Sequence, residues 1–233
     1  MEKQRLKMYE SFFVGAILAV IGGYLDAYTY IARGQVFANA QTGNVVLLGL
    51  RAADGEWARA LMYLMPIIAF ALGIFLSESV RRHFDKGKLH WQQYIILLEL
   101  AVITIVSLFP RGMYNNVNFD TISNIMVSFV CSLQVQSFRR IRNITCATTM
   151  CTGNLRSALE ALDKYKTTRE SKFLHDAGKF FGIVLFFIIG AVISTFLTRL
   201  FMEKSSLFCA GGLLLVFIIL FFDSGLSKKN ERK

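Results

Sequence analysis

The chain has 233 residues, of which 54% are hydrophobic and 18% charged, and its formal net charge is +10. This apolar content excludes a disordered chain, and 4 cysteines are too few for a disulfide-stapled secreted domain. Long stretches without a basic residue argue against a nucleic-acid-binding protein.

Six apolar runs are long enough to cross the ~30 Å hydrocarbon layer of a membrane, which takes about 20 helical residues. The fifth run is the plainest, because residues 180–196 include no charge. A core helix of a soluble protein would show a polar face, and these runs do not. The sequence therefore predicts an all-α integral membrane protein with transmembrane helices at 11–31, 60–80, 91–110, 121–138, 178–198 and 205–222.

Two further segments, 35–53 and 144–162, each carry a Thr-Gly-Asn tripeptide in a mixed polar and apolar stretch. They are either additional spans or re-entrant loops. Cations that flank spans gather on the cytoplasmic side. With re-entrant loops, 20 of the 26 Lys and Arg residues fall on one side, whereas eight full spans divide them 13 to 13. The count favours six spans, two re-entrant half-helices, and cytoplasmic termini at 1–10 and 223–233.

The two halves of the sequence repeat each other. The tripeptides lie 110 residues apart, as Thr42-Gly43-Asn44 and Thr152-Gly153-Asn154. The same offset pairs Asp26 with Gln136. In the next span of each half, a small-residue pair recurs at an offset of 117, as Gly73-x-x-x-Ser77 and Gly190-x-x-x-Ser194. Such pairs let neighbouring helices approach closely.

These correspondences divide the chain into a first repeat at 11–110 and a second at 121–222, each with three spans and one re-entrant loop. An odd number of spans inverts the second repeat relative to the first. An inverted 3+3 repeat is the design of many transporters, with a ligand site near the membrane midplane. A parallel duplication with eight spans is the alternative, and the charge count disfavours it.

The tripeptides are the candidate substrate site. A short helix starting at Asn44 or at Asn154 would begin near the bilayer centre, and helix amino termini attract polar or anionic groups. Asn and Thr are also natural helix caps, so two capped, broken helices without a ligand are the structural alternative. The predicted substrate-binding residues are Thr42, Gly43, Asn44, Thr152, Gly153 and Asn154.

Three further polar residues lie at membrane depth. Asp26 follows two Gly residues and lies among three Tyr residues, and Glu99 lies in the middle of the third span. Carboxylates inside a membrane are costly and usually functional, so either is a candidate for coupling to a proton or cation. The alternative is a structural hydrogen bond. Gln136 is included as the repeat equivalent of Asp26.

Signatures of catalysis are weak. The three His residues flank spans, and Cys146 and Cys151 beside the second loop make a poor metal site. No phosphate-binding glycine loop or nucleophile elbow is present. The sequence therefore predicts no enzyme activity, no cofactor and no metal.

The run from Gly22-Gly23-Tyr24-Leu25-Asp26-Ala27-Tyr28 to Gln41-Thr42-Gly43-Asn44, with a second Thr-Gly-Asn later on, resembles the YoaK-type family of bacterial inner-membrane proteins. The similarity covers about 11–222. It implies a polytopic protein of the bacterial plasma membrane and supplies no substrate, because the family is a domain of unknown function.

Together these features predict a transporter or channel for a small polar or charged solute. A non-transporting membrane scaffold or regulatory protein is the alternative. The expected partners are the solute and the anionic lipids of the inner leaflet, with no nucleic acid, and self-association is compatible with the sequence.

Overall fold

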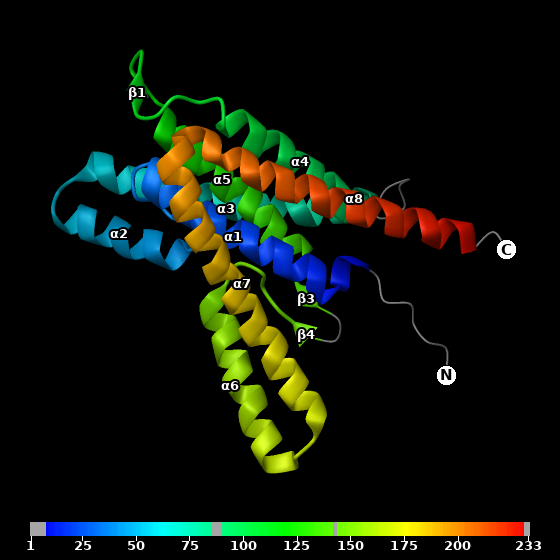
Figure 1. Cartoon of the computed structure of the whole chain (residues 1–233). Helices are drawn as coiled ribbons and strands as arrows, with labels where there is room; N and C mark the ends of the chain where they lie inside the picture. The colour runs from blue at the N-terminus through cyan, green and yellow to red at the C-terminus, as the bar shows by residue number, and fades with distance from the viewer. Residues whose placement is uncertain (1–7, 85–89, 142–143, 231–233) are drawn as a thin grey trace.

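The structure is a computed structural model, and it describes residues 8–84, 90–141 and 144–230, with side chains only up to residue 223 in the last helix. Residues 1–7 of the predicted amino-terminal segment and 231–233 of the predicted basic tail lie outside the described residues. Eight α-helices, two short 3-10 helices and two small hairpins make up the described fold (Figure 1). In chain order the elements are η1 (Met8–Glu10), α1 (Phe12–Ala32), α2 (Gln41–Ala53), α3 (Trp57–Phe84), α4 (Trp91–Val106), β1 (Met113–Tyr114), β2 (Val117–Asn118), α5 (Phe119–Ser137), β3 (Arg140–Ile141), β4 (Ile144–Thr145), α6 (Cys151–Thr168), α7 (Ser171–Phe201), η2 (Met202–Ser205) and α8 (Ser206–Asn230).

Each apolar run expected to span the membrane is occupied by a helix: α1, α3, α4, α5, α7 and α8. Three helical stretches of the described chain are long and apolar enough to cross a membrane, namely α1, α3 and the continuous stretch Ser171–Asp223. That last stretch has 53 residues, about 80 Å of helix, which exceeds twice the thickness of the hydrocarbon layer. It holds two helices, because Met202 has a φ of 51° and ends α7.

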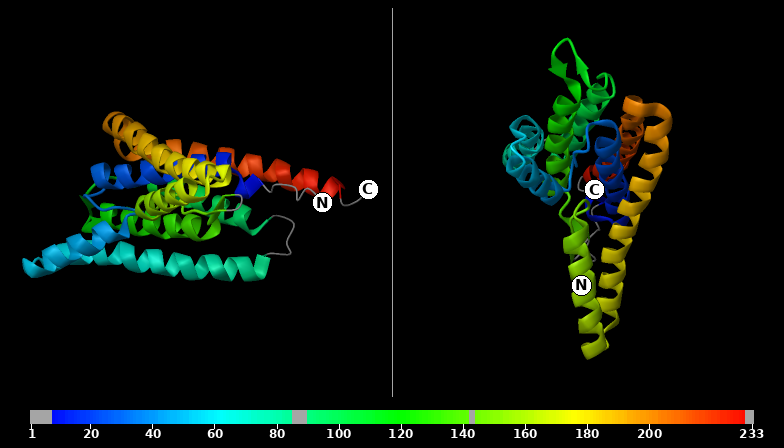
Figure 2. Two further views of the ribbon diagram at one scale, coloured as in Figure 1. Left: turned by 90° about the horizontal axis from the view of Figure 1, so that it is seen from below. Right: turned by 90° about the vertical axis from the view of Figure 1, so that its left-hand side faces the viewer.

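Helices α4 and α5 depart from the simple pattern of a lipid-facing span. Helix α4 is apolar but has only 16 residues. Helix α5 buries a series of polar side chains, Ser123, Asn124, Ser128, Ser132, Gln134 and Ser137. It lies in the middle of the molecule between α3, α4 and α1 (Figure 2). Protein rather than lipid therefore surrounds the polar positions of α5.

Helices of the first half pack mainly against helices of the second half. Helix α1 packs along α7, and its repeat equivalent α5 packs along α3. Helix α2 lies on α3 as α6 lies on α7, and α4 packs against α8. At the α1–α7 crossing, Gly23 faces the backbone of Phe187 and Gly190 faces the backbone of Val20. At the α3–α5 crossing, Gly73 faces the backbone of Phe129. The repeated small residues thus permit close contact between halves.

Arg33 is the largest side chain that the fold buries completely. It directly follows the last residue of α1, and its guanidinium lies between α1, the end of α4 and the start of α5. It forms an ion pair of 3.2 Å with Asp120 and donates to the hydroxyl of Tyr28 and to backbone carbonyls of Val106, Phe109 and Pro110. Arg33 therefore ties the end of α1 to the end of α4 and the start of α5.

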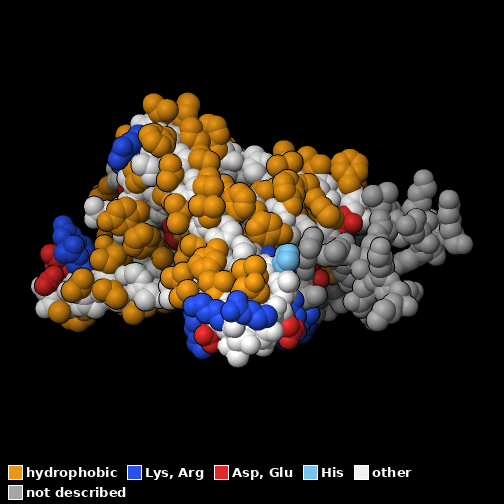
Figure 3. Space-filling model, turned by 60° about the horizontal axis from the view of Figure 1, so that its bottom comes forward, with side chains coloured by type: hydrophobic (Ala, Val, Ile, Leu, Met, Phe, Trp, Pro, Cys, Tyr) orange, Lys and Arg blue, Asp and Glu red, His pale blue; other side chains and the backbone are white. Residues whose placement is uncertain are grey.

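The surface has a broad apolar region. Figure 3 shows hydrophobic side chains over most of the face in view, with charged side chains gathered at separate ends. One charged group is the α2–α3 turn, where Arg51 and Arg59 both pair with Glu56. Large apolar side chains are exposed between the ends, including Phe75 of α3 and Phe196 of α7. An exposed apolar surface of this extent fits lipid contact.

Candidate functional site

The tips of both loops that precede the Thr-Gly-Asn helices reach the middle of α1. The side-chain amide of Asn39 donates to the carbonyl oxygen of Gly22, and the Asn39 backbone N–H donates to Asp26 Oδ1 at 2.6 Å. From the second loop, the methyl group of Thr149 packs on Gly22 so closely that a Cβ there would lie 2.5 Å away. Gly22 therefore contacts both loops, and its lack of a side chain admits the second one.

A cavity of about 590 Å³ lies where the two loops meet. The first loop and α2 contribute Asn39, Ala40, Gln41 and Thr42, and the second loop and α6 contribute Thr149, Met150, Cys151, Thr152 and Gly153. Helix α1 adds Asp26 and Tyr30, α3 adds Phe70, and α7 adds Phe187 and Thr195. The sequence predicted that both tripeptide regions belong to a single site, and residues of both regions line this cavity.

The side-chain caps that the structural alternative required do not form. Helix α2 begins at Gln41 after Ala40, and α6 begins at Cys151 after Met150, so each tripeptide lies inside the first turn. Neither helix has a side-chain cap at its first residue. The reason is that the chain becomes helical three residues before each Asn.

Each Asn instead fastens its own helix to the incoming loop. Asn44 accepts from the backbone N–H of Phe37 at 3.1 Å and donates to the Phe37 carbonyl at 2.7 Å. Asn154 donates to the carbonyl of Ala147 at 2.6 Å and accepts from the thiol of Cys146 at 3.2 Å. Burial raises the pKa of the Cys146 thiol to about 12, which keeps it protonated as a donor. Phe37 and Ala147 are again 110 residues apart, so the two loops are pinned in the same way.

The predicted substrate residues divide into two groups. Thr42, Thr152 and Gly153 line the cavity. Asn44 and Asn154 are buried and do not line it, because their side-chain amides bond to the loops. Gly43 packs against the ring of Phe37. The side chains that face a solute in this cavity therefore differ from the amides that the sequence suggested.

Replacing Asn154 by Ala is expected to destabilise the protein by about 1–3 kcal/mol, because the buried carbonyl of Ala147 and the Cys146 thiol lose their partner. Asn44→Ala should act similarly on Phe37. Thermal unfolding of the detergent-solubilised variants measures this. The exposed Thr167→Ala provides the control, and equal stability of all three variants would contradict the pinning role.

Of the three other polar candidates, only Asp26 belongs to the cavity. Glu99 is buried on α4, and within the described residues its Oε1 has no hydrogen-bond partner. Gln136 lies at the end of α5, where its amide donates to Glu78 of α3. The structure thus separates Glu99 and Gln136 from the site around Asp26.

The second re-entrant segment is longer than expected. Helix α6 extends to Thr168, beyond the predicted end at residue 162, and it carries an exposed ion pair between Arg156 and Glu160. Exposed charges are costly in lipid, so only the start of α6 is suited to membrane depth. Its first turn is the part that lines the cavity.

Asn39 and Thr149 are site residues that sequence reasoning missed. They lie 110 residues apart, which is the offset of the predicted repeat, and each is 5% exposed. Among the described atoms, Asn39 Oδ1 and Thr149 Oγ1 are buried without a hydrogen-bond partner. The repeat offset could have paired them, but their identities differ, and only the folded loops show that both tips reach one cavity.

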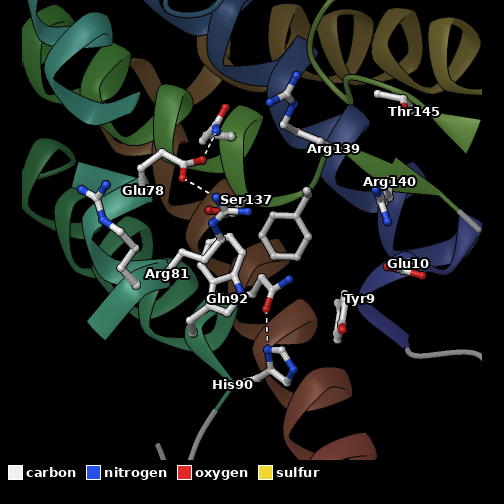
Figure 4. Close-up of a pocket in the computed structure, with 14 residues that line it drawn as sticks. Tyr9, Glu10, Glu78, Arg81, His90, Gln92, Ser137, Arg139, Arg140 and Thr145 are labelled. Carbon is white, nitrogen blue, oxygen red and sulfur yellow. Dashed lines mark hydrogen bonds and ion pairs between the residues drawn. The ribbon is translucent and has the colours of Figure 1, made fainter. Parts of the chain in front are cut away.

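A second pocket of about 830 Å³ lies at the ends of α3 and α5 (Figure 4). Arg81, Arg139 and Arg140 line it together with Glu10 and Glu78. Two contacts join α3 and α5 beside this pocket. Glu78 accepts from Gln136, and the hydroxyls of Ser77 and Ser137 are hydrogen-bonded at 3.0 Å. We call the first cavity the loop cavity and this one the arginine pocket.

No group of His, Cys, Asp and Glu suited to a metal ion occurs in the part of the chain that the structure describes. The apolar helices and the loops between them define a helical membrane protein with a polar break at its centre.

Comparisons with known proteins agree with this class. Residues 14–220 match the family described as "Protein of unknown function (DUF1275)", and the chain belongs to that family. It is also similar to the "UPF0700 transmembrane protein YoaK" of Bacillus subtilis (strain 168), with 23% identity over 183 residues that cover 76% of this chain and 80% of the relative. The family resemblance seen in the sequence is thereby confirmed. No solved structure matches the chain.

Proposed function

We propose that the protein is a transporter that carries a small solute through the loop cavity. The observation that carries the proposal is that two equivalent loops, one from each half of the chain, end at the same cavity in the middle of α1. Irregular backbone at membrane depth is tolerated where it lines a cavity. A purely structural pair of loops would leave no reason for a 590 Å³ space between them.

The architecture we propose is an inverted repeat of six spans and two re-entrant half-helices. The helix contacts support it. If α1 corresponds to α5 and α3 to α7, the α1–α7 contact of one half corresponds to the α5–α3 contact of the other. The α2–α3 and α6–α7 contacts correspond in the same way. We place both termini on the cytoplasmic side of a bacterial plasma membrane, where the excess cations would meet anionic lipids.

Equivalent residues of the two proposed repeats make different contacts. Gln136 and Glu78 of the arginine pocket correspond to Asp26 and Thr195 by the offsets of 110 and 117. Gln136 is bonded to Glu78, whereas Asp26 and Thr195 both line the open loop cavity and Thr195 bonds to Ala191 of its own helix. We propose that the contact between Gln136 and Glu78 closes the path inward from the arginine pocket and that the loop cavity is the open side of the repeat, as alternating access requires.

A neighbouring pocket offers the route to the loop cavity that we propose. A further pocket of about 590 Å³ shares Tyr30 and Ile31 with the loop cavity. Its lining includes Arg51 and Arg59, which are both paired with Glu56. On the topology proposed above, this route opens to the outside and the arginine pocket opens to the cytoplasm.

Replacing Glu78 by Ala is expected to weaken the closed side. Loss of a partly exposed hydrogen bond to a charged group is worth about 1 kcal/mol, which is about five-fold in the population of the opposite state. Cys151 reports the change, because it lines the loop cavity and the other three cysteines are buried. We expect about five-fold faster labelling of Cys151 from the cytoplasmic face by a membrane-impermeant thiol reagent.

Arg81→Ala is the matched control for Glu78→Ala. It removes the exposed ion pair of Glu78 and keeps the contact between Glu78 and Gln136. Equal labelling rates in Glu78→Ala, Arg81→Ala and the unaltered protein would contradict the closing role of Glu78.

Transport itself is tested by reconstitution. Proteoliposomes are incubated with a metabolite extract of a bacterium, and the solutes retained inside are measured by mass spectrometry. The matched control is the same protein with a bulky maleimide on Cys151, which fills part of the loop cavity. We expect at least one solute that accumulates only with the unmodified protein. Identical contents in both preparations would favour the scaffold alternative.

A further inference from the structure

We propose that the loop cavity binds a monovalent organic cation with an apolar body, and that Asp26 holds either this cation or a proton. The inference rests on the proposed transport function and gives its substrate class. Asp26 is the only lining residue with a formal charge, and Lys, Arg and His are absent from the described lining. A solute that enters this space therefore meets one negative charge.

Asp26 has no cationic partner in the described structure. It is 6% exposed, and it accepts hydrogen bonds from backbone N–H groups of the first loop, that of Asn39 at 2.6 Å from Oδ1 and those of Ala38 and Ala40 beside it. The ion pairs that the described residues form all involve other carboxylates. A buried carboxylate is costly unless a proton or a cation neutralises it. The backbone N–H groups carry only partial charges, so we infer that a full countercharge comes from a proton or from the ligand.

The rest of the lining suits the apolar body of such a cation. Tyr30 and Phe37 are stacked with their ring centroids 5.0 Å apart, and Phe70 and Phe187 contribute two more rings. Aromatic faces attract cations, and more strongly when both are desolvated. A volume of about 590 Å³ accommodates a small organic molecule. Unpartnered Asn39 Oδ1 and Thr149 Oγ1 at the loop tips add two oxygen atoms to the same lining.

The helix amino termini at the cavity favour an anion rather than a cation. Helices α2 and α6 both begin there, and each is equivalent to about half a positive charge. An anion would gain from them but would also meet the carboxylate of Asp26. The full charge of Asp26 is the only one in the lining, so we expect the cation to be preferred, and the test below compares both signs directly.

One carboxylate cannot hold a proton and a cation together. Binding of a cation to protonated Asp26 breaks the carboxyl O–H bond and releases one proton to water, and the carboxylate then pairs with the cation. The titratable groups that interact with Asp26 from neighbouring elements are the thiols of Cys131 on α5 and Cys151 on α6, and Tyr30 shares the lining. Such an exchange couples outward movement of the cation to inward movement of a proton.

The experiment compares three probes on the full-length protein in detergent, by calorimetry in weak buffer with a pH indicator. The probes are benzyltrimethylammonium, phenylacetate and benzyl alcohol, which share an aromatic ring and differ in charge. The quaternary cation carries no ionisable proton, so every proton released comes from the protein. We expect the cation to bind at least ten-fold more tightly than the other two and to release up to one proton, with the number falling as pH rises.

Asp26→Asn keeps an oxygen for the N–H of Asn39 and removes the charge, so it should lose at least ten-fold in cation affinity and all proton release. Glu170→Gln removes one exposed carboxylate at the start of α7 and should change neither. Tighter binding of phenylacetate, unchanged cation binding in Asp26→Asn, or no binding of the cation at all would overturn the assignment.

The failure of this inference is distinguishable from failure of the proposed function. In the same preparations, the rate at which a thiol reagent labels Cys151 measures whether water reaches the cavity. If phenylacetate slows the labelling of Cys151 and the cation does not, the cavity binds a solute but prefers the opposite charge. That result would overturn this inference and leave the proposed function standing. A cavity that no reagent reaches would remove both proposals.

Discussion

Gly190→Ala is expected to destabilise the protein by about 3 kcal/mol, at the upper end of the usual range for overpacking. A Cβ at this position would overlap the backbone carbonyl of Val20 on α1, and its three nearest atoms all belong to that backbone. No side-chain rotation relieves such a contact, so α1 and α7 must separate along their crossing. Thermal or denaturant unfolding in detergent measures the loss.

Gly178→Ala is the matched control, because Gly178 lies in the same helix with open space around it. Alanine is the better helix former by about 0.5–1 kcal/mol, so this variant should be slightly more stable than the unaltered protein. The separation of α1 from α7 should also change the loop cavity, which both helices line. Equal stability of the two variants would show that the α1–α7 crossing is looser than described.

Arg33→Met is expected to cost about 3–5 kcal/mol, because breaking a buried ion pair from one side leaves the partner charge uncompensated. The side chain of Arg33 is 0% exposed and that of Asp120 is 17% exposed. Removal of the guanidinium also leaves the carbonyls of Val106, Phe109 and Pro110 without this donor. Unfolding of the purified variant provides the measurement.

The double variant Arg33→Met with Asp120→Asn sharpens this prediction. It should recover part of the loss, because the remaining amide is neutral and keeps an oxygen for the N–H of Gly112. Arg59→Ala, which breaks an exposed pair with Glu56, should cost less than about 1 kcal/mol. A loss at Arg33 no larger than that at Arg59 would contradict the structural role of the buried pair.

The positions of the helices could be predicted from the sequence because each apolar run exceeds what a soluble core helix needs. The breaks at both Thr-Gly-Asn tripeptides could also be predicted, because each tripeptide lies in a mixed polar and apolar segment and the two are separated by the same offset that relates other residues of the halves. The number of spans does not follow from the number of helices. Helix α4 is short, and α5 hides its polar residues inside the protein, so composition alone does not identify either as lipid-facing.

Side-chain partners could not be predicted in the same way. Arg33 follows the first apolar run, and its own helix supplies only the hydroxyl of Tyr28 as an acceptor. The approach of α4 and α5 adds four further hydrogen-bond acceptors. The position of Asn44 in the sequence suggests a helix cap. In the fold its amide instead bonds to the backbone N–H and carbonyl of Phe37, because the loop passes beside it. Asn39 and Thr149 carry no motif at all. Their place at the cavity depends on how far each loop penetrates, which sequence spacing does not fix.

The central claim is that the loop cavity connects with water from either face of the membrane in turn, and labelling of Cys151 tests it most directly. Burial raises the pKa of this thiol, so labelling should be slow at neutral pH and faster at higher pH. We expect an impermeant reagent to label right-side-out and inverted vesicles, at one site per chain that Cys151→Ser abolishes. Complete inertness of Cys151 from both faces would contradict the claim.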